Sequence, residues 1–247
     1  GLKADYIIAN PPFNYSAWRT ENELIDDDRW QGYPVPPVSN ANYAWILHIV
    51  SKLKKNGSAA FLLANGALSA GAEEKQIRMK LIQNDLIESI ITLPREMFYS
   101  TDISVTLWII NKDKKNSTNI KNIRDTQNKI LFLDLRRKGK EVEKYIELSS
   151  DDITDAKNVY NNWKSTAFKK KYKDIGEYSY SASLEEIKKN DYSLITSEYV
   201  KFINKESNIN YDNEMKIIQK DFKHLLEEEE NANSLLKLAF KKLGYEL

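Results

Sequence analysis

Short apolar runs alternate with amphipathic segments over the first 110 residues of the chain. The apolar runs have the length and composition of buried strands, and they cover residues 5–9, 58–64, 88–93 and 104–110. Helical spacing of apolar positions fills residues 40–55, with Gly57 where a C-cap is expected, and residues 73–84. The last two runs are close enough in sequence to pair antiparallel. This order predicts an α/β fold whose sheet is mostly parallel, with one reversed strand.

The pattern becomes more polar beyond the fourth apolar run. Residues 112–128 are polar and basic, which predicts a surface excursion, and residues 129–135 are one more strand candidate. Residues 151–163 are predicted to be helical, with Ser150 or Asp151 as the N-cap.

Two further helices are predicted near the C-terminus. Ser183 and Glu186 have the spacing of a capping box, which predicts a short helix. Residues 213–243 contain no Gly or Pro and predict a long helix with one interruption, Glu229, in its apolar stripe. The stripe repeats every four and three residues at Ile218, Phe222, Leu225, Ala232, Leu236, Ala239 and Leu243. Such a stripe needs a partner, either the chain's own domain or another subunit.

Composition excludes several classes of chemistry. The 247 residues are 41% hydrophobic and 30% charged, enough to bury a core. The absence of cysteine excludes disulfides, thiolate metal sites and cysteine nucleophiles, and the two histidines, His48 and His224, argue against an imidazole-rich metal site. We therefore assign no metal. No apolar run approaches the roughly 20 residues of a membrane span, so a soluble, cytoplasmic protein is expected.

Basic residues are concentrated in one part of the chain, although its net charge is only +1. Residues 112–140 carry ten Lys and Arg against three Asp and Glu. Such a stretch is suited to phosphate binding, and a solvated loop is the alternative.

The sharpest chemical signal is Asn10-Pro11-Pro12-Phe13, directly after the first apolar run. Ligands of open parallel sheets bind beyond the carboxyl ends of strands, where this tetrapeptide is expected. The Asn10 amide offers an acceptor oxygen, the prolines stiffen the turn and leave its carbonyls free, and Phe13 offers a flat apolar face. These groups suit a planar ligand with an exocyclic amine. A Pro-Pro turn that merely ends a strand is the alternative.

Five segments together resemble the modification subunit of type I restriction–modification systems, an N6-adenine DNA methyltransferase. The tetrapeptide resembles the catalytic motif of amino-group methyltransferases that use S-adenosylmethionine. The other segments are Asp-Arg-Trp at residues 28–30, Ala-Asn-Tyr-Ala-Trp at 41–45, Leu-Pro-Arg-Glu-Met-Phe at 93–98 followed by 101–103, and Asn-Asp-Tyr-Ser-Leu at 190–194. Their order and spacing also resemble the family over residues 3–200.

The resemblance implies a partial catalytic domain. Family members carry a Gly-rich cofactor turn before the catalytic motif, whereas this chain contains no Gly-x-Gly. We therefore expect the C-terminal half of a Rossmann-like S-adenosylmethionine-dependent methyltransferase sheet in residues 1–148, and a helical extension for subunit assembly in residues 149–247. Most of the cofactor site is expected to lie outside the chain, so that the chain alone binds S-adenosylmethionine weakly and is inactive.

The resemblance also implies a mechanism and partners. An adenine flipped out of double-stranded DNA would place its N6 amine against the Asn10 side-chain oxygen and the Pro11 carbonyl, with Phe13 stacked on the base. Asn10 would also border the cofactor. The expected protein partners are the DNA-specificity subunit, the restriction (helicase–nuclease) subunit and a second copy of the modification subunit.

Two further residues are weaker site candidates by position. Asn42, with Trp45, opens a predicted helix near the pocket and is a candidate for cofactor binding, with helix capping and core packing as the alternative. Asn65 follows the second strand at the same sheet edge and is a candidate for substrate binding.

Two other functions remain open. Some methyltransferases of guanine amino groups in ribosomal RNA also carry Asn-Pro-Pro-Phe, although they would lack the heptad tail. A fragment that only assembles or clamps DNA, without chemistry of its own, is the non-enzymatic alternative.

Overall fold

The computed structural model describes residues 1–99, 102–167, 172–202 and 211–244. The chain divides into two compact units, Gly1–Phe202 and Ile203–Leu247, which are described separately. The domain boundary expected after residue 148 does not coincide with this division, because a strand beyond that point completes the sheet of the first unit.

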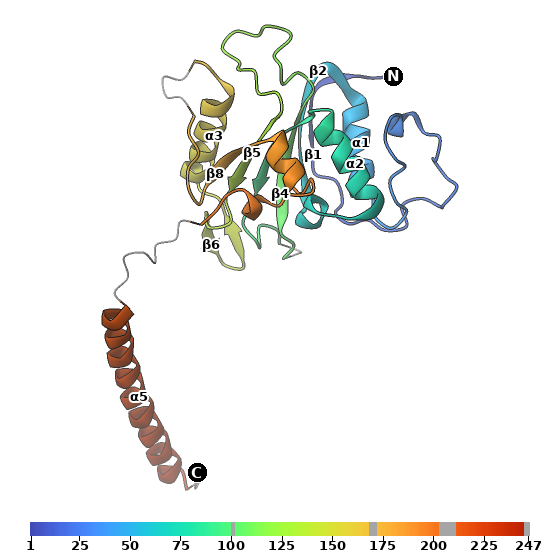
Figure 1. The fold of residues 1–247 in the computed structure, drawn as a ribbon. Helices are drawn as coiled ribbons and strands as arrows, with labels where there is room; N and C mark the ends of the chain where they lie inside the picture. The colour runs from blue at the N-terminus through green and yellow to red at the C-terminus, as the bar shows by residue number, and fades with distance from the viewer. Residues whose placement is uncertain (100–101, 168–171, 203–210, 245–247) are drawn as a thin grey trace. The chain divides into compact units, whose positions relative to one another are not determined.

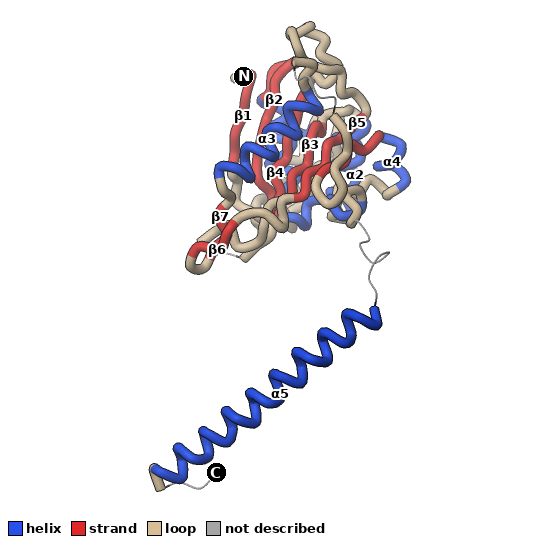
Figure 2. Tube along the Cα trace, turned by 90° about the vertical axis from the view of Figure 1, so that its left-hand side faces the viewer, coloured by secondary structure: helices blue, strands red, loops and turns tan. Residues whose placement is uncertain are grey.

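Six strands of the first unit form one mixed sheet (Figures 1 and 2). They are β1 (Ala4–Ala9), β2 (Leu53–Ala64), β3 (Ile87–Thr92), β4 (Val105–Asn111), β5 (Lys129–Asp134) and β8 (Ser179–Ser183). Their order is β1-β2-β4-β3-β5-β8, in which β1, β2, β3 and β5 are parallel while β4 and β8 run the other way. The largely parallel sheet and the antiparallel pairing of β3 with β4 are confirmed. The edge strand β8 adds a second reversed strand to the one predicted.

Helices cover both faces of this sheet (Figures 1 and 2). The helices packed on one face are α1 (Asn42–Lys52), α2 (Ala72–Gln83) and α4 (Leu184–Lys189), and α3 (Ser150–Lys164) packs on the other. The smaller elements are η1 (Asp28–Trp30), η2 (Asn65–Leu68), η3 (Thr196–Glu198) and a hairpin of β6 (Lys140–Val142) and β7 (Tyr145–Glu147). In the second unit, α5 (Tyr211–Lys242) confirms the long helix. Among the helices of the described residues, none is both long and apolar enough to cross a membrane.

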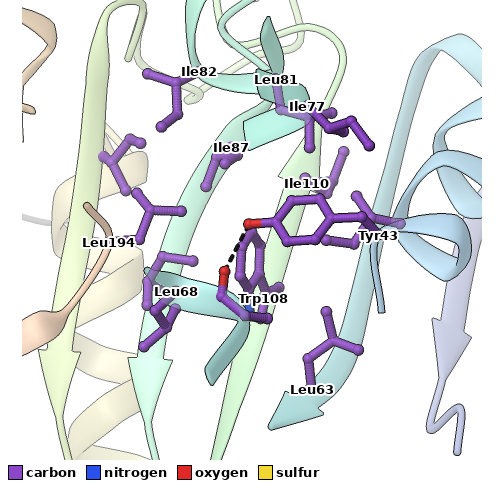
Figure 3. Packing of buried hydrophobic residues seen from close by; sticks show 14 of the residues in the cluster. Tyr43, Leu63, Leu68, Ile77, Leu81, Ile82, Ile87, Trp108, Ile110 and Leu194 are labelled. Atoms are coloured by element: carbon purple, nitrogen blue, oxygen red, sulfur yellow. Dashed lines mark hydrogen bonds between the residues drawn. The ribbon is translucent and has the colours of Figure 1, made fainter. Parts of the chain in front are cut away.

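The larger of two cores lies between the sheet and α1, α2 and α4 (Figure 3). Tyr43 and Trp108 are fully buried there with their rings nearly perpendicular, 6.4 Å apart between centroids. The Tyr43 hydroxyl donates a hydrogen bond of 2.6 Å to the Ala67 carbonyl, so the phenol oxygen is not left unpaired in the core. Leu194 enters the same core and holds the segment after α4 against the sheet.

The first helix ends earlier than predicted, and Gly57 is not its C-cap. Helix α1 stops at Lys52 and β2 begins at Leu53, so Gly57 lies within the strand. A Cβ at Gly57 would stand 2.9 Å from the Ala4 carbonyl oxygen, which is closer than real contacts. The glycine therefore serves the close approach of β1, at a bulge where the register slips between Ala4 and Tyr6.

The N-cap of α3 is Ser149, not Ser150 or Asp151. Its hydroxyl accepts a hydrogen bond from the Asp152 amide, and the Asp152 carboxylate accepts one from the Ser149 amide. This capping box fixes the start of the helix because each side chain satisfies an amide that the helix leaves unpaired.

We expect Ser149→Ala to lower the free energy of unfolding of the 247-residue chain by about 1 kcal/mol, the usual cost of losing an N-cap serine. Ser150→Ala, one residue further, should change it by less than about 0.5 kcal/mol. Urea denaturation followed by circular dichroism compares the two variants. Equal effects would contradict the assignment of Ser149 as the cap.

The basic stretch of residues 112–140 does not form one surface. Because β4 runs against its parallel neighbours, residues 112–128 leave the sheet at the amino ends of the parallel strands. Residues 136–140 follow β5 and lie at the carboxyl ends of these strands. Within the first segment, Lys114 is buried and donates hydrogen bonds to the Asp85 carboxylate and to two backbone carbonyls. That lysine anchors the loop and is not available to bind phosphate.

Candidate active site

The Asn-Pro-Pro-Phe motif stands at the carboxyl end of β1, as the sequence predicts. Along β1, Ile7 and Ala9 pack against the larger core while Tyr6 and Ile8 are exposed. Asn10 continues the exposed series, and the rings of Pro11 and Phe13 are half-buried while Pro12 is exposed. The Asn10 amide is thus open to a ligand at the edge where open α/β sheets bind theirs.

Asn42 holds the segment that follows the motif. Its Oδ1 accepts a hydrogen bond of 3.0 Å from the Asn14 backbone amide, and its Nδ2 donates one of 2.9 Å to Asn14 Oδ1. Asn14 has a φ of 52°, a left-handed conformation that asparagine tolerates better than most residues. Asn42 is 1% exposed, so its amide is committed to positioning this turn. Its binding to cofactor stays a prediction.

Phe98 lies against the motif, although sequence reasoning gave it no role. The loop after β3 brings its ring to 5.8 Å from that of Phe13, centroid to centroid, at 76°. Phe98 belongs to the Leu-Pro-Arg-Glu-Met-Phe segment, which supported the resemblance but did not indicate contact with Phe13. Thr101, in the segment after it, lies outside the described residues. The two half-buried rings form an edge-to-face pair beside the exposed amide.

The β6–β7 hairpin supports the loop that carries Phe98. The Ile146 amide donates a 2.8 Å hydrogen bond to the Glu96 carbonyl. The Tyr145 ring lies 4.6 Å from that of Tyr99, between centroids. Residues far apart in sequence thereby fix the loop next to the motif.

Asn65 lies at a cavity of its own. It follows β2 at the same sheet edge as Asn10, and its Oδ1 accepts a hydrogen bond from the Thr106 hydroxyl. The cavity is ≈ 330 Å³ in volume, and Asn10 and Phe13 are not among the residues that line it. The structure thus does not bring Asn65 to the motif, and its predicted contact with substrate remains untested.

Trp45 lines a separate aromatic cavity of ≈ 200 Å³ between α1 and the irregular residues 14–38. Trp18, Trp30 and Arg29 share this cavity, and the Arg29 guanidinium lies 4.7 Å from the Trp30 ring centroid. A hydrogen bond from Arg29 lowers the pKa of Asp27 to about 2. This ion pair and the buried indole of Trp30 order the loop of residues 14–38.

The loop contains three consecutive aspartates, at residues 26–28, which do not form a metal site. Asp27 is committed to Arg29. Among the described residues, no group of three acidic, histidine or cysteine side chains is placed to hold a metal.

The residues present fit one end of a cofactor site. An exposed amide oxygen at the carboxyl end of β1 suits the place where an amine meets a transferred methyl group. Among the described strands, β1 pairs on one edge only, with β2.

A largely parallel sheet, with a reversed strand between β2 and β3 and this motif at the end of β1, defines a Rossmann-like methyltransferase fold. The sequence model of the N-6 DNA Methylase family matches residues 2–208, and the chain belongs to this family.

Relatives bear this out. The type I restriction enzyme MjaIX methylase subunit of Methanocaldococcus jannaschii is 34% identical over 98% of this chain, and the HindI methylase subunit of Haemophilus influenzae is 36% identical over 80%. The chain spans 42% of the length of each of these relatives.

Solved structures show the same fold. The type I restriction–modification methyltransferase subunit from Streptococcus thermophilus superposes with a TM-score of 0.68 at 28% identity, over 81% of this chain and 39% of that one. The EcoKI M protein superposes with a TM-score of 0.61 over 83% of this chain and 45% of that one. At 16% identity, the second likeness supports the fold alone.

Proposed function

We propose that this chain is the catalytic-motif part of a type I modification subunit that methylates the N6 of adenine in double-stranded DNA. The observation that carries the proposal is the exposed Asn10 amide beside the paired rings of Phe13 and Phe98. An acceptor for an exocyclic amine next to an aromatic face is what an adenine needs for this reaction.

The chain's own residues would bind and orient the base. Asn10 Oδ1 and the Pro11 carbonyl accept hydrogen bonds from the N6 amine, which favours the geometry in which the nitrogen lone pair is available. Pro11 and Pro12 have no N–H, so no backbone donor of theirs competes for these acceptors. S-adenosylmethionine, when bound, supplies an electrophilic methyl group. We place Asn10 at the border of that cofactor.

The amine is accessible only when the base leaves the duplex. In double-stranded DNA the N6 amine is paired and stacked, so enzymes acting on it extrude the nucleotide. Phe13 stacks on the extruded ring in this proposal, and Phe98 packs edge-to-face with Phe13.

The partners follow from the same proposal. We infer assembly with a DNA-specificity subunit, a restriction subunit and a second modification subunit. The apolar stripe of α5 is the surface we assign to the specificity subunit. For the 247-residue chain alone we expect weak cofactor binding and no turnover.

Methyl transfer from labelled cofactor tests the proposal. A complete subunit containing these residues, assembled with its specificity subunit, should label duplex DNA at adenine N6. Label in ribosomal RNA guanine would support the rival enzyme, and label in neither substrate would support a module without chemistry.

We expect Phe13→Ala to weaken capture of the flipped base by about 1–3 kcal/mol, the usual value of one aromatic stack. Phe98→Ala should cost less, about 0.5–1.5 kcal/mol, since it removes only the edge contact with Phe13. The readout is KM for DNA in the assembled enzyme. Phe202→Ala is the control, because this exposed ring stacks on Arg137 instead. A larger effect of Phe202→Ala than of Phe13→Ala would contradict the assignment.

A further inference from the structure

A cavity of ≈ 330 Å³ opens where β2, β3 and β5 end. The carboxyl ends of the parallel strands β1, β2, β3 and β5 lie on the same side of the sheet, so the cavity and Asn10 lie on that side too. Its polar side chains come from four separated stretches of sequence and are those of Asn65, Ser69, Thr92, Arg136, Thr196 and Ser197. The lining contains no carboxylate side chain.

The back wall of the cavity is fixed. The hydroxyls of Thr92 and Thr196 lie 2.6 Å apart, and both residues are at most 4% exposed. The Leu194 amide donates a 2.9 Å hydrogen bond to the Leu68 carbonyl, which ties the segment after α4 to η2. Each of these contacts joins residues more than 100 positions apart in sequence, and together they fix the shape of the back wall.

Arg136 presents one side of its guanidinium outward. Its Nε and Nη2 donate to the Asp134 carboxylate, and its backbone amide also donates to that carboxylate at 3.0 Å. These bonds raise the pKa of Arg136 and keep it charged. Within the described part of the chain Nη1 makes no hydrogen bond, and the side chain is 41% exposed. The guanidinium is therefore held in place with one face available.

Asn65 contributes a second oriented donor. Because its Oδ1 accepts from Thr106, the amide is fixed with Nδ2 as the remaining donor, which has no partner among the described residues. The exposed hydroxyls of Ser69 and Ser197 stand at the same cavity. A charged guanidinium, an amide N–H and hydroxyls, with no lining carboxylate, select an anion that carries several oxygens.

We infer that this cavity binds a phosphodiester group of the DNA strand that carries the methylated adenine. The inference deepens the proposed function and rests on it. A phosphodiester offers two non-bridging oxygens, which share one negative charge, to the guanidinium and the amide, and this suits the planar donor set of arginine. Because the cavity and Asn10 both lie at the carboxyl ends of the parallel strands, one DNA strand can reach both sites.

The test compares Arg136→Ala and Asn65→Asp with Lys121→Ala in the methylase assembled with its specificity subunit. Lys121 is exposed in residues 112–128, at the opposite edge of the sheet, and its loss changes the net charge by the same amount as that of Arg136. DNA affinity is measured by fluorescence anisotropy across a range of salt concentrations. Inorganic phosphate, added at constant ionic strength, serves as a competitor.

Arg136→Ala should weaken binding of specific and non-specific DNA about equally and reduce the slope of log K against log salt by about 1. Asn65→Asp keeps the side-chain size but adds a repelling charge, and should also weaken binding. Lys121→Ala should leave the slope unchanged. Competition by inorganic phosphate that Arg136→Ala abolishes would support the cavity as an anion site.

An unchanged slope in Arg136→Ala, with unchanged affinity in Asn65→Asp, would overturn the inference while wild-type methylation still supported the proposed function. An equal loss in Lys121→Ala would overturn it too, because net charge would then explain the result. Absence of methylation by the wild type would instead refute the proposed function.

Discussion

Asn10→Ala in the assembled methylase should lower kcat by about 10²–10³-fold, equivalent to about 2.7–4 kcal/mol, the scale measured for one positioned catalytic hydrogen bond. Asn10 is exposed at the end of β1. In the proposed mechanism its side chain acts on the amine during the reaction and contributes little to binding of the duplex. The dissociation constant for DNA should change by less than about three-fold, because duplex binding depends mainly on phosphate contacts elsewhere. Single-turnover methylation and anisotropy measure the two quantities.

Asn56→Ala is the matched control. Asn56 is also an exposed asparagine, but it lies near the start of β2, away from the end at which Asn10 stands. Its replacement should leave both kcat and DNA affinity unchanged. Methylation by Asn10→Ala within a few-fold of wild type would show that the motif is not catalytic. A parallel loss of DNA binding would assign Asn10 to substrate capture instead.

In the first unit, the elements that sequence patterns predict are those that bury an apolar face. The strands β2 to β5 are apolar runs because both of their faces are covered, and the helices α1 and α2 show the apolar spacing of one buried face. Strand β8 escaped prediction because Ser-Tyr-Ser-Ala-Ser has no apolar run. It is a strand through its backbone pairing with β5, which local sequence does not encode.

The site divides in the same way. Asn10 and Phe13 were predictable because one strand and two prolines determine their position locally. Phe98 and Thr196 were not, because a loop and a segment distant in sequence carry them to the sheet edge. For Gly57 the local rule was wrong. The rule predicts a helix C-cap at this glycine, but the glycine lies in β2, where the close approach of β1 requires it.

Leu225→Asp combined with Leu236→Asp should abolish assembly with the specificity subunit. Within the described part of its unit, α5 is the only helix or strand, so no other element of that unit packs on its apolar stripe. Leu225 and Leu236 are 59% and 52% exposed. Burying one such side chain contributes roughly 1.5–3 kcal/mol, so several of them would provide much of an interface before association costs are subtracted.

The partner should be a different helix rather than a second α5. Glu229 interrupts the stripe once, which disfavours a long symmetric coiled coil because two carboxylates would meet in the seam. Docking on another subunit can accommodate the interruption with a single basic or polar contact.

Co-expression followed by size-exclusion chromatography measures the assembly. Asn231→Asp with Ser234→Asp is the control, because it introduces the same two carboxylates on the opposite side of the helix from Leu225. The control should co-elute with the specificity subunit, and the leucine variant should elute alone with its α/β unit folded by circular dichroism. Co-elution of the leucine variant would show that the stripe is not the interface. Loss of soluble protein by the leucine variant, with the control variant soluble, would point to packing of the stripe on its own chain.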